Sequence, residues 1–251
     1  MIHREDRDGT ALLRLEHGKV QALDLELLQQ IQSAIADVER SNARAIVLIG
    51  TGGSFSAGVD LFRVLDGGRA YIERFLPALN DALLALLRCP LPVVAALNGH
   101  AIAGGCVVAC ACDRRVMANG KGRVGVPELA VGVPFPVLAF EVVRASTPAE
   151  HLRELIYDGA TFPVSDALAR GLVDEVVEPD ALLPRALAIA AQLGAIPRQS
   201  FALAKAEMNA PVLDTFARSS AHERQVVETW CRPETLAAIR AYLDRVVGKS
   251  K

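Results

Sequence analysis

Two glycine-containing turns, each on a loop that follows an apolar run of strand length, could present backbone N–H groups to a ligand. The first turn lies at residues 57–59 (AGV), and the second lies at residues 103–105 (AGG), where a helix is expected to begin. Two such donors aimed at one point would form an oxyanion hole, and the helix N-terminus would add a partial positive charge. This arrangement suits chemistry in which negative charge develops on a carbonyl oxygen, as in an enolate. The spacing is equally compatible with glycines that only turn the chain.

The glycines after the first apolar run do not match a nucleotide-binding loop. Residues 50–53 (GTGG) follow a strand-like run, but the dinucleotide fingerprint G-x-G-x-x-G needs a glycine where Phe55 stands. A P-loop needs a lysine after its last glycine, and no lysine occurs between Lys19 and Lys121. We therefore do not expect a nucleotide cofactor at this loop.

A serine-hydrolase motif is nearly present in the same region. Residues 54–58 (SFSAG) lack the first glycine of the elbow pattern G-x-S-x-G. His100 is a conceivable base, but nothing in the sequence places it beside Ser56. Small residues in a tight loop are the simpler explanation.

Three cysteines between residues 106 and 112, with the nearby His100, raise the question of a metal site. Zinc ligands usually occur as C-x₂₋₄-C pairs in loops, with a second pair elsewhere in the chain. Here the neighbouring residues are valine and alanine. The pattern is more typical of buried thiols that pack as small hydrophobic side chains.

The composition indicates one large folded domain. The chain has 251 residues, of which 51% are hydrophobic, and a formal net charge of −2 from 27 basic and 29 acidic residues. These values exclude a disordered chain. The basic residues form no stripe and aromatic residues are only 5%, which argues against a nucleic-acid binder. The odd number of cysteines, five, does not indicate a disulfide framework.

We expect no targeting or membrane segment in this chain. Residues 1–8 (MIHREDRD) are charged where a signal peptide would need an apolar stretch. The most apolar region, residues 90–112, is interrupted by proline, asparagine and glycine, so it does not read as a membrane span. A cytoplasmic protein with reduced thiols is expected.

Strand, glycine turn and helix follow one another at least twice, which indicates an α/β fold. The residues in question form apolar runs of strand length and segments of helical periodicity. Up to residue 118, we expect strands at 10–15, 45–49, 92–97 and 115–118 and helices at 23–38, 69–88 and 106–112, with Asp24 as N-cap of the first helix.

The character of the chain changes after about Pro148, where helical periodicity predominates. Pro197 and Pro211 interrupt this region, and its last helix is amphipathic. The expected helices are 149–157, 165–170, 181–193, 200–209, 215–230 and 233–247. A helical end of this kind often serves assembly.

Five short segments, spread in order over most of the chain, share their pattern with one known family. They are residues 55–61 (FSAGVDL), 92–101 (PVVAALNGHA), 103–113 (AGGCVVACACD), 126–132 (VPELAVG) and 167–177 (ALARGLVDEVV). In that order they resemble F-x-A-G-x-D-[LI], P-V-I-A-A-V-N-G-x-A, G-G-G-x-E-L-A-x-x-C-D, x-P-E-x-x-x-G and A-x-x-x-G-L-V-D-x-V-V. The chain is therefore identified as a member of the enoyl-CoA hydratase/isomerase (crotonase) family.

The resemblance implies an α/β fold built as a spiral of ββα units and followed by a helical trimerisation region. We expect the spiral core and the acyl-CoA site at residues 1–190, and the C-terminal helical oligomerisation region at residues 191–251. The implied assembly is a homotrimer or a dimer of trimers. The implied ligand is an acyl-CoA thioester, with coenzyme A present as part of the substrate. No prosthetic group, metal, nucleic acid or membrane partner is expected.

The resemblance also assigns roles to individual residues. The backbone N–H groups of Val59 and Gly104 would form the oxyanion hole, and Glu128 would be the catalytic residue. Phe62 stands where some hydratases have a lysine that can reach the CoA phosphate, and Arg63 follows it. Contacts with the substrate and with CoA are expected at Lys19, Val20, Ala22, Ala57, Asp60, Leu61, Phe62, Gly105 and Val107.

One departure from the family pattern bears on the reaction. Hydratases use two glutamates to hold and activate water, and the second of these matches Glu128. The first falls on Val107, which can neither accept a proton nor orient a water. The resemblance therefore favours a 3,2-trans-enoyl-CoA isomerase, in which Glu128 moves a proton from the alpha carbon to the gamma carbon through a thioester enolate. The apolar residues around Glu128 would raise its pKa toward that of a useful base.

Other activities stay open. Within the family these are an enoyl-CoA hydratase of fatty acid beta-oxidation and an acyl-CoA hydrolase or decarboxylase. Two alternatives belong to other functional classes: a serine peptidase with the same spiral fold and a non-catalytic binding protein. The acyl chain length is not readable, although we expect the acyl pocket to be lined by Val107, Phe135, Phe140 and Phe162.

Overall fold

A computed structural model describes residues 1–247 of the chain. Its centre is a six-stranded sheet in which β1 pairs antiparallel with β2 and all other neighbours are parallel. The strand order is β1 (Ile2–Arg7), β2 (Thr10–Leu15), β3 (Ala45–Ile49), β5 (Val93–Leu97), β7 (Arg114–Ala118) and β10 (Glu175–Val177).

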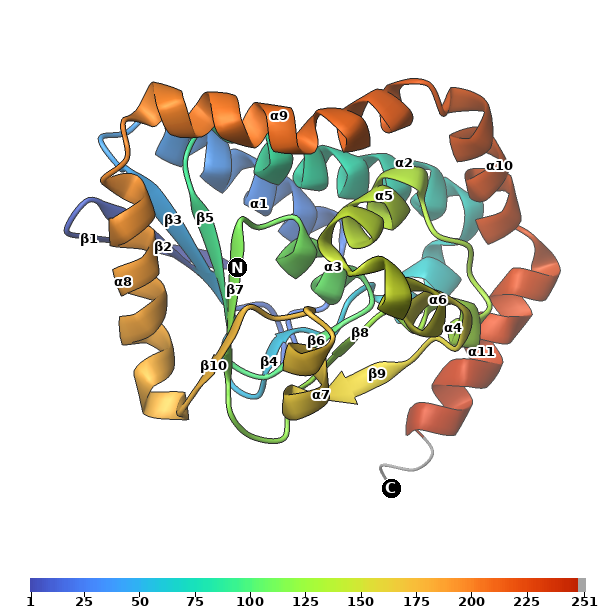
Figure 1. Cartoon of the computed structure of the whole chain (residues 1–251). Coiled ribbons are helices and arrows are strands. Elements are labelled where there is room, and N and C mark those ends of the chain that lie inside the picture. The colour runs from blue at the N-terminus through green and yellow to red at the C-terminus, as the bar shows by residue number, and fades with distance from the viewer. Residues whose placement is uncertain (248–251) are drawn as a thin grey trace.

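A second, smaller sheet has four short strands and lies beside the first (Figure 1). Its strand order is β4 (Ser54–Ser56), β6 (His100–Ile102), β8 (Arg123–Gly125) and β9 (Thr161–Pro163). Successive strands of the chain alternate between the two sheets before a helix follows, as in β3–β4–α2 and β5–β6–α3. This alternation is the expected spiral of ββα units.

The helices surround both sheets. Seven helices lie between β2 and β10 in the chain. They are α1 (Leu25–Glu39), α2 (Leu61–Arg88), α3 (Gly104–Cys110), α4 (Glu128–Val131), α5 (Val137–Ser146), α6 (Ala149–Tyr157) and α7 (Val164–Ala169). After β10 come a short 3₁₀ turn (Pro179–Ala181) and the helices α8 (Leu182–Gly194), α9 (Arg198–Ala217), α10 (Ser220–Trp230) and α11 (Pro233–Val247).

The central strands of the six-stranded sheet are buried on both faces because their side chains alternate between two apolar clusters. Ile46 and Leu48 of β3 point into the large core shared with α1, α2 and α3. Ala45, Val47 and Ile49 of the same strand point to the other face, which α8 covers. A strand that is apolar at every position therefore fits the centre of this sheet.

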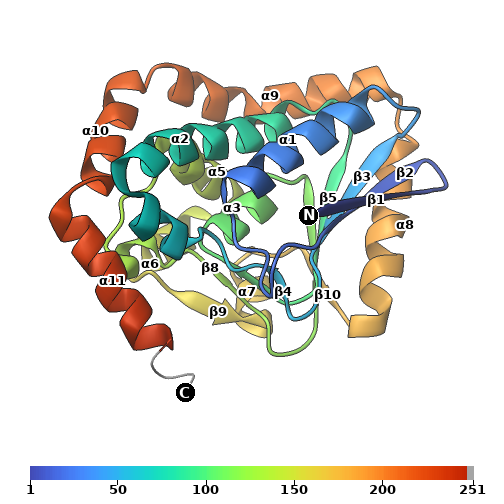
Figure 2. The ribbon, with the colours of Figure 1, turned by 180° about the vertical axis from the view of Figure 1, so that it is seen from behind.

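The C-terminal helices wrap around the core. Figure 1 shows α9 along the top of the molecule, with α10 and α11 descending on the side opposite α8. From behind, α1 and α2 lie side by side beneath α9 (Figure 2). Residues 190 and 191, where we placed the boundary of the helical region, both lie within α8.

Several expectations from the sequence need correction. The chain after residue 148 is not all helical, because β9 and β10 complete the two sheets. Residues 2–7 form an edge strand despite their charge, and charged residues suit an exposed edge. Pro211 lies inside α9 rather than ending it. The helix after the first glycine loop begins earlier than expected, at Leu61, with a kink at Gly68.

The expected N-cap of the first helix is confirmed. Helix α1 begins after Asp24, whose carboxylate accepts a 2.8 Å hydrogen bond from the N–H of Leu27 as an N-cap does. Within residues 1–247, no helix has an apolar stretch long enough to cross a membrane.

Candidate active site

The two glycine turns meet at one edge of the smaller sheet. Strands β4 and β6 are parallel neighbours, with Ser54 opposite His100 and Ser56 opposite Ala101. Because parallel strands present their carboxyl ends at the same edge, the loops that follow them are adjacent. Ala103, the N-cap of α3, has φ of 52° and ψ of −130°, which turns the chain sharply into the helix.

The close approach of the two turns requires glycine. Gly58 has φ of +84°, and a Cβ there would lie 2.6 Å from the carbonyl oxygen of Ile102 and 3.0 Å from the nitrogen of Gly104. A Cβ on Gly105 would lie 2.3 Å from the carbonyl oxygen of Ser56. The glycines therefore allow backbone-to-backbone packing that a side chain would prevent.

Two backbone N–H groups at this junction have no acceptor within the described residues. The N–H groups on either side of Val59 are used, since Gly58 donates to Ser56 Oγ at 3.1 Å and Asp60 donates to the Leu23 carbonyl at 2.9 Å. The N–H of Val59 and the N–H of Gly104, in the first turn of α3, remain free there. A Cβ built on Gly104 would lie 3.6 Å from Cγ2 of Val59, so the two donors are close neighbours.

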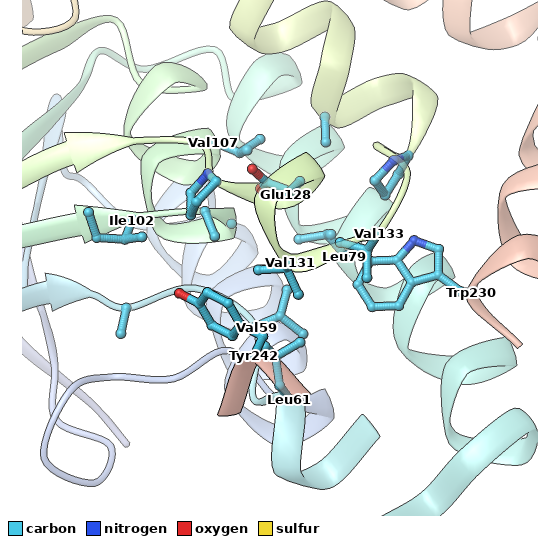
Figure 3. A pocket seen from close by; sticks show the side chains of 16 residues that line it. Val59, Leu61, Leu79, Ile102, Val107, Glu128, Val131, Val133, Trp230 and Tyr242 are labelled. Atoms are coloured by element: carbon cyan, nitrogen blue, oxygen red, sulfur yellow. The ribbon is translucent and has the colours of Figure 1, made fainter. Parts of the chain in front are cut away.

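These donors border an apolar pocket with a cavity volume of about 80 Å³ (Figure 3). Its wall comes from both glycine turns, from α2, α4 and α5, and from the C-terminal helices α10 and α11. The lining residues are Ala57, Val59, Leu61, Leu79, Ile102, Ala103, Gly104, Val107, Pro127, Glu128, Val131, Val133, Pro136, Ala139, Trp230 and Tyr242.

Glu128 is the one acidic side chain among these lining residues. It is the first residue of α4, follows Pro127 and is only 8% exposed. Its Oε2 is buried and has no hydrogen-bond partner among the described residues. Burial disfavours the charged carboxylate and raises the pKa of Glu128 to about 8, against an ordinary value near 4.5. This carboxyl group is therefore placed to exchange a proton near neutral pH with a group inside the pocket.

The structure brings six of the predicted site residues to the pocket wall: Ala57, Val59, Leu61, Gly104, Val107 and Glu128. Val107 lies close to Glu128 in Figure 3. Gly105 lies just outside, packed on Ser56 as described above.

The predicted CoA-contacting turn lies next to the pocket rather than in it. Val20 is 41% exposed, and its carbonyl accepts a 2.9 Å hydrogen bond from the N–H of Ala57. Between Val20 and Ala22, the buried Gln21 donates through Nε2 to the carbonyls of Thr51 and Ser54. The turn is thereby fastened to the loop that carries Ala57, with Lys19 exposed beside it.

Two further predicted residues, Asp60 and Phe62, lie at the start of α2 beside Arg63. Asp60 is the N-cap and accepts a 3.1 Å hydrogen bond from the N–H of Arg63. Phe62 does not line the pocket and is 56% exposed. The guanidinium of Arg63 contacts Glu26 at 3.2 Å and Asp24 at 3.5 Å, so it is already paired with acids.

The expected phenylalanine lining is wrong. Phe135 and Phe140 pack edge-on at 6.0 Å and face a separate hollow with His222. Phe162 lies under the guanidinium of Arg170, 4.3 Å from the ring centroid. None of these three rings reaches the pocket, because α4 and α5 turn aliphatic residues and prolines toward it.

The sequence analysis missed the residues that close the pocket from the C-terminal helices. Trp230 ends α10 and Tyr242 lies on α11, and both contribute to the wall together with Leu79 of α2. Helical periodicity indicates that Tyr242 belongs to one face of its helix. It does not indicate which part of the core that face covers.

The alternative sites suggested by the sequence are not supported by the geometry. Ser56 is fully buried, and its hydroxyl donates to the carbonyl of Gln21 at 2.7 Å, so it is not presented as a nucleophile. Within residues 1–247, no cluster of three or more His, Cys, Asp or Glu side chains could hold a metal ion. The five cysteines are free thiols, and four of them are buried.

Comparison with known proteins places this site in a family. Residues 5–246 match the family model of enoyl-CoA hydratase/isomerase. The mitochondrial enoyl-CoA delta isomerase 1 of Rattus norvegicus is 27% identical over 253 residues, which cover 99% of this chain and 88% of the relative. A probable enoyl-CoA hydratase of Mycolicibacterium paratuberculosis is 31% identical over 88% of this chain and 87% of its own length.

Solved structures agree. The crystal structure of human mitochondrial delta3-delta2-enoyl-CoA isomerase superposes with a TM-score of 0.95 at 26% identity, covering 100% of this chain and 99% of that one. The match of the family model to nearly the whole chain, together with this fold, shows that the chain belongs to the enoyl-CoA hydratase/isomerase (crotonase) family of acyl-CoA enzymes.

Proposed function

We propose that this family member is a 3,2-trans-enoyl-CoA isomerase. The observation that carries the proposal is the composition of the pocket wall, where Glu128 is the one acid among the lining residues and Val107 fills the position near it. A single buried carboxylate can pick up a proton and return it. Without a second carboxylate, the pocket lacks the pair of groups that would hold and activate a water.

The thioester oxygen of the substrate binds between the N–H groups of Val59 and Gly104. These donors have no other acceptor among the described residues, so they are available to a ligand. As the proton leaves the alpha carbon, negative charge develops on the thioester oxygen, and two fixed donors stabilise that enolate. Removing one donor of this type typically costs about 10²–10³-fold in rate.

Glu128 shuttles the proton. Its carboxylate removes a proton from the alpha carbon of a 3-enoyl-CoA, and the electrons of that bond move into the thioester to form the enolate. The carboxylic acid then delivers the proton to the gamma carbon, and the double bond ends between the alpha and beta carbons. A pKa of about 8 suits both halves of this cycle, because base and acid forms are both populated near neutral pH.

The resemblance to the family supports two further proposals, on the CoA part of the ligand and on the assembly. We propose that the CoA part lies along the turn of Lys19, Val20 and Ala22, which is fastened beside Ala57. We also propose that residues 191–251 contribute to a homotrimer or a dimer of trimers.

The second candidate is an enoyl-CoA hydratase, since the relative from Mycolicibacterium paratuberculosis carries that name. One experiment separates the two. The protein is incubated with a 3-enoyl-CoA and, separately, with a 2-enoyl-CoA in ¹⁸O-labelled water, and the products are separated by liquid chromatography before mass spectrometry. Isomerisation of the first without labelled 3-hydroxyacyl-CoA from the second supports the isomerase. Fast incorporation of labelled water would overturn it.

A further inference from the structure

The acyl pocket has an open end and a closed end. Val59 and Ile102 are half-buried and border its mouth. At the other end, Leu79 and Val133 are each 3% exposed and Trp230 is 2% exposed. Figure 3 shows Trp230 beside Leu79 and Val133, away from Ile102, with Glu128 between the two ends. An acyl chain whose thioester lies at the mouth would therefore extend toward the indole.

The indole of Trp230 is held in one orientation. Its Nε1 donates a 2.9 Å hydrogen bond to the carbonyl of Pro134, which uses the polar edge and leaves an apolar surface for the pocket. Swinging the ring away would leave a buried N–H without a partner.

The helix that carries Trp230 is also anchored at two points. The carboxylate of Glu223, near the start of α10, accepts hydrogen bonds from Asn80 Nδ2 at 2.9 Å and from the N–H of Val137, the first residue of α5. Nearer to Trp230, Glu228 pairs with Arg69 of α2 at 2.8 Å. The end of the pocket is therefore a fixed wall.

We infer that Trp230 sets the maximum length of acyl chain that this enzyme accepts. The inference rests on the proposed function, in which an acyl-CoA occupies the pocket. Each methylene that enters the apolar pocket is expected to tighten binding by up to about fourfold, the equivalent of about 0.8 kcal/mol. Once the chain reaches the indole, a further methylene must displace a packed wall, and affinity falls instead of rising.

Trp230 is the sole tryptophan of the chain, so its emission reports on this end of the pocket directly. The wild-type protein is titrated with saturated straight-chain acyl-CoAs of increasing length, and affinity and emission are both recorded. We expect short chains to bind with little change in emission, and longer chains to change it at the length where affinity stops rising. An emission unaffected by any chain that binds would overturn the inference.

The matched variants are Trp230→Leu and Phe140→Leu. The first shortens the wall with an apolar side chain, and the second removes an aromatic ring that lies in the neighbouring hollow instead of the pocket. By titration calorimetry, Trp230→Leu should move the affinity optimum to longer chains by at least two carbons, and Phe140→Leu should leave it in place. An unmoved optimum in folded Trp230→Leu would overturn the role of Trp230. If that variant does not fold, the wild-type emission decides.

Saturated acyl-CoAs have no double bond to move, so this test does not depend on isomerisation. A length-dependent emission change in a protein without isomerase activity would leave the inference intact while removing the proposed reaction. If the protein is an active isomerase but neither its emission nor its affinity depends on chain length, the proposed reaction stands and the inference about Trp230 fails.

Discussion

The carboxylate of Glu128 and the isopropyl group of Val107 lie near each other on the wall of one apolar pocket, and no second acid joins them among the described lining residues (Figure 3). The pocket wall therefore combines a single carboxyl group with two backbone donors, those of Val59 and Gly104, that have no acceptor among the described residues. Each of these features can be altered separately by mutation.

Substitution of Glu128 by glutamine should abolish isomerisation while leaving the fold intact. Glutamine has the same shape but cannot carry the proton, and loss of a general acid–base group typically costs about 10²–10⁴-fold in rate. The measurement is the steady-state rate with a 3-enoyl-CoA, with Trp230 emission on binding a saturated acyl-CoA as the control for an intact pocket. A rate near that of the wild type would remove Glu128 from the mechanism.

The raised pKa of Glu128 makes both activity and stability depend on pH. The isomerisation rate should rise with pH toward about 8, as the carboxylate forms. Stability should change in the opposite sense. The folded protein holds the proton of Glu128 more tightly than the unfolded chain does. The contribution of this proton to the free energy of unfolding is therefore complete below about pH 4.5 and is lost as pH rises to about 8.

Between about pH 4.5 and pH 8, the free energy of unfolding should fall by up to about 1.4 kcal/mol for each pH unit. Urea unfolding of wild type and Glu128→Gln at several pH values isolates this contribution, because the variant has no carboxyl group to titrate there. The difference in unfolding free energy between the two proteins should grow steadily from pH 5 to pH 8. A constant difference would show that Glu128 has an ordinary pKa.

Substitution of Gly58 by alanine should damage the oxyanion hole. The new Cβ would meet the carbonyl of Ile102 at 2.6 Å and the nitrogen of Gly104 at 3.0 Å, which forces the two turns apart. The matched control is Gly52→Ala, since Gly52 also has a positive φ, of +62°, but has open space around its Cβ position. Both variants carry backbone strain of about 1 kcal/mol or more.

Only Gly58→Ala should also lose about 10²-fold or more in the rate of isomerisation. The two rates are compared under conditions where both variants are folded. Equal rates would mean that separation of the turns does not affect catalysis.

A glutamate at position 107 should introduce water addition. Val107→Glu places a second carboxylate in the pocket, and it should raise hydration of a 2-enoyl-CoA by at least about tenfold. The nearby charge should also raise the pKa of Glu128 further, which slows isomerisation at neutral pH. Val107→Gln is the control, since it adds a polar side chain of the same length without a proton acceptor. Hydration by both variants alike, or by neither, would contradict the role assigned to Val107.

Local patterns in the sequence predicted a large part of this fold. The N-cap at Asp24, the strand at residues 45–49 and the helix turn at Gly104 each depend on neighbours in the chain, and the structure confirms them. The convergence of the turns at Gly58 and Gly104 was left open by their spacing, and the parallel pairing of β4 with β6 brings them together.

Other elements depend on contacts between distant parts of the chain. Strands β9 and β10 have three residues each, too few for a periodic pattern, and are defined by pairing with β8 and β7. Trp230 lies on the pocket wall because α10 is anchored to α2 and α5, which its own sequence does not reveal. The predicted lining by phenylalanines was wrong for the same reason, because the type of a side chain does not indicate which of two neighbouring hollows it faces.

The C-terminal helices are tied to the core by an ion pair between a buried lysine and a half-buried aspartate, and this pair should be costly to break. Lys205 of α9 is 5% exposed, and its Nζ lies 2.8 Å from Oδ2 of Asp113 and 3.3 Å from the carbonyl of Leu91. Lys205→Met leaves the half-buried carboxylate of Asp113 without its cation, which should lower the unfolding free energy by about 1–3 kcal/mol.

The double variant Lys205→Met/Asp113→Asn should recover much of that loss, because the asparagine still accepts the N–H of Val93 that Oδ2 now binds at 2.7 Å. The control is Lys121→Met, an exposed lysine whose replacement should stay within about 0.5 kcal/mol. Urea unfolding measures all three variants. If the double variant were as unstable as Lys205→Met alone, the cost would come from lost packing of the lysine stem rather than from an unpaired charge.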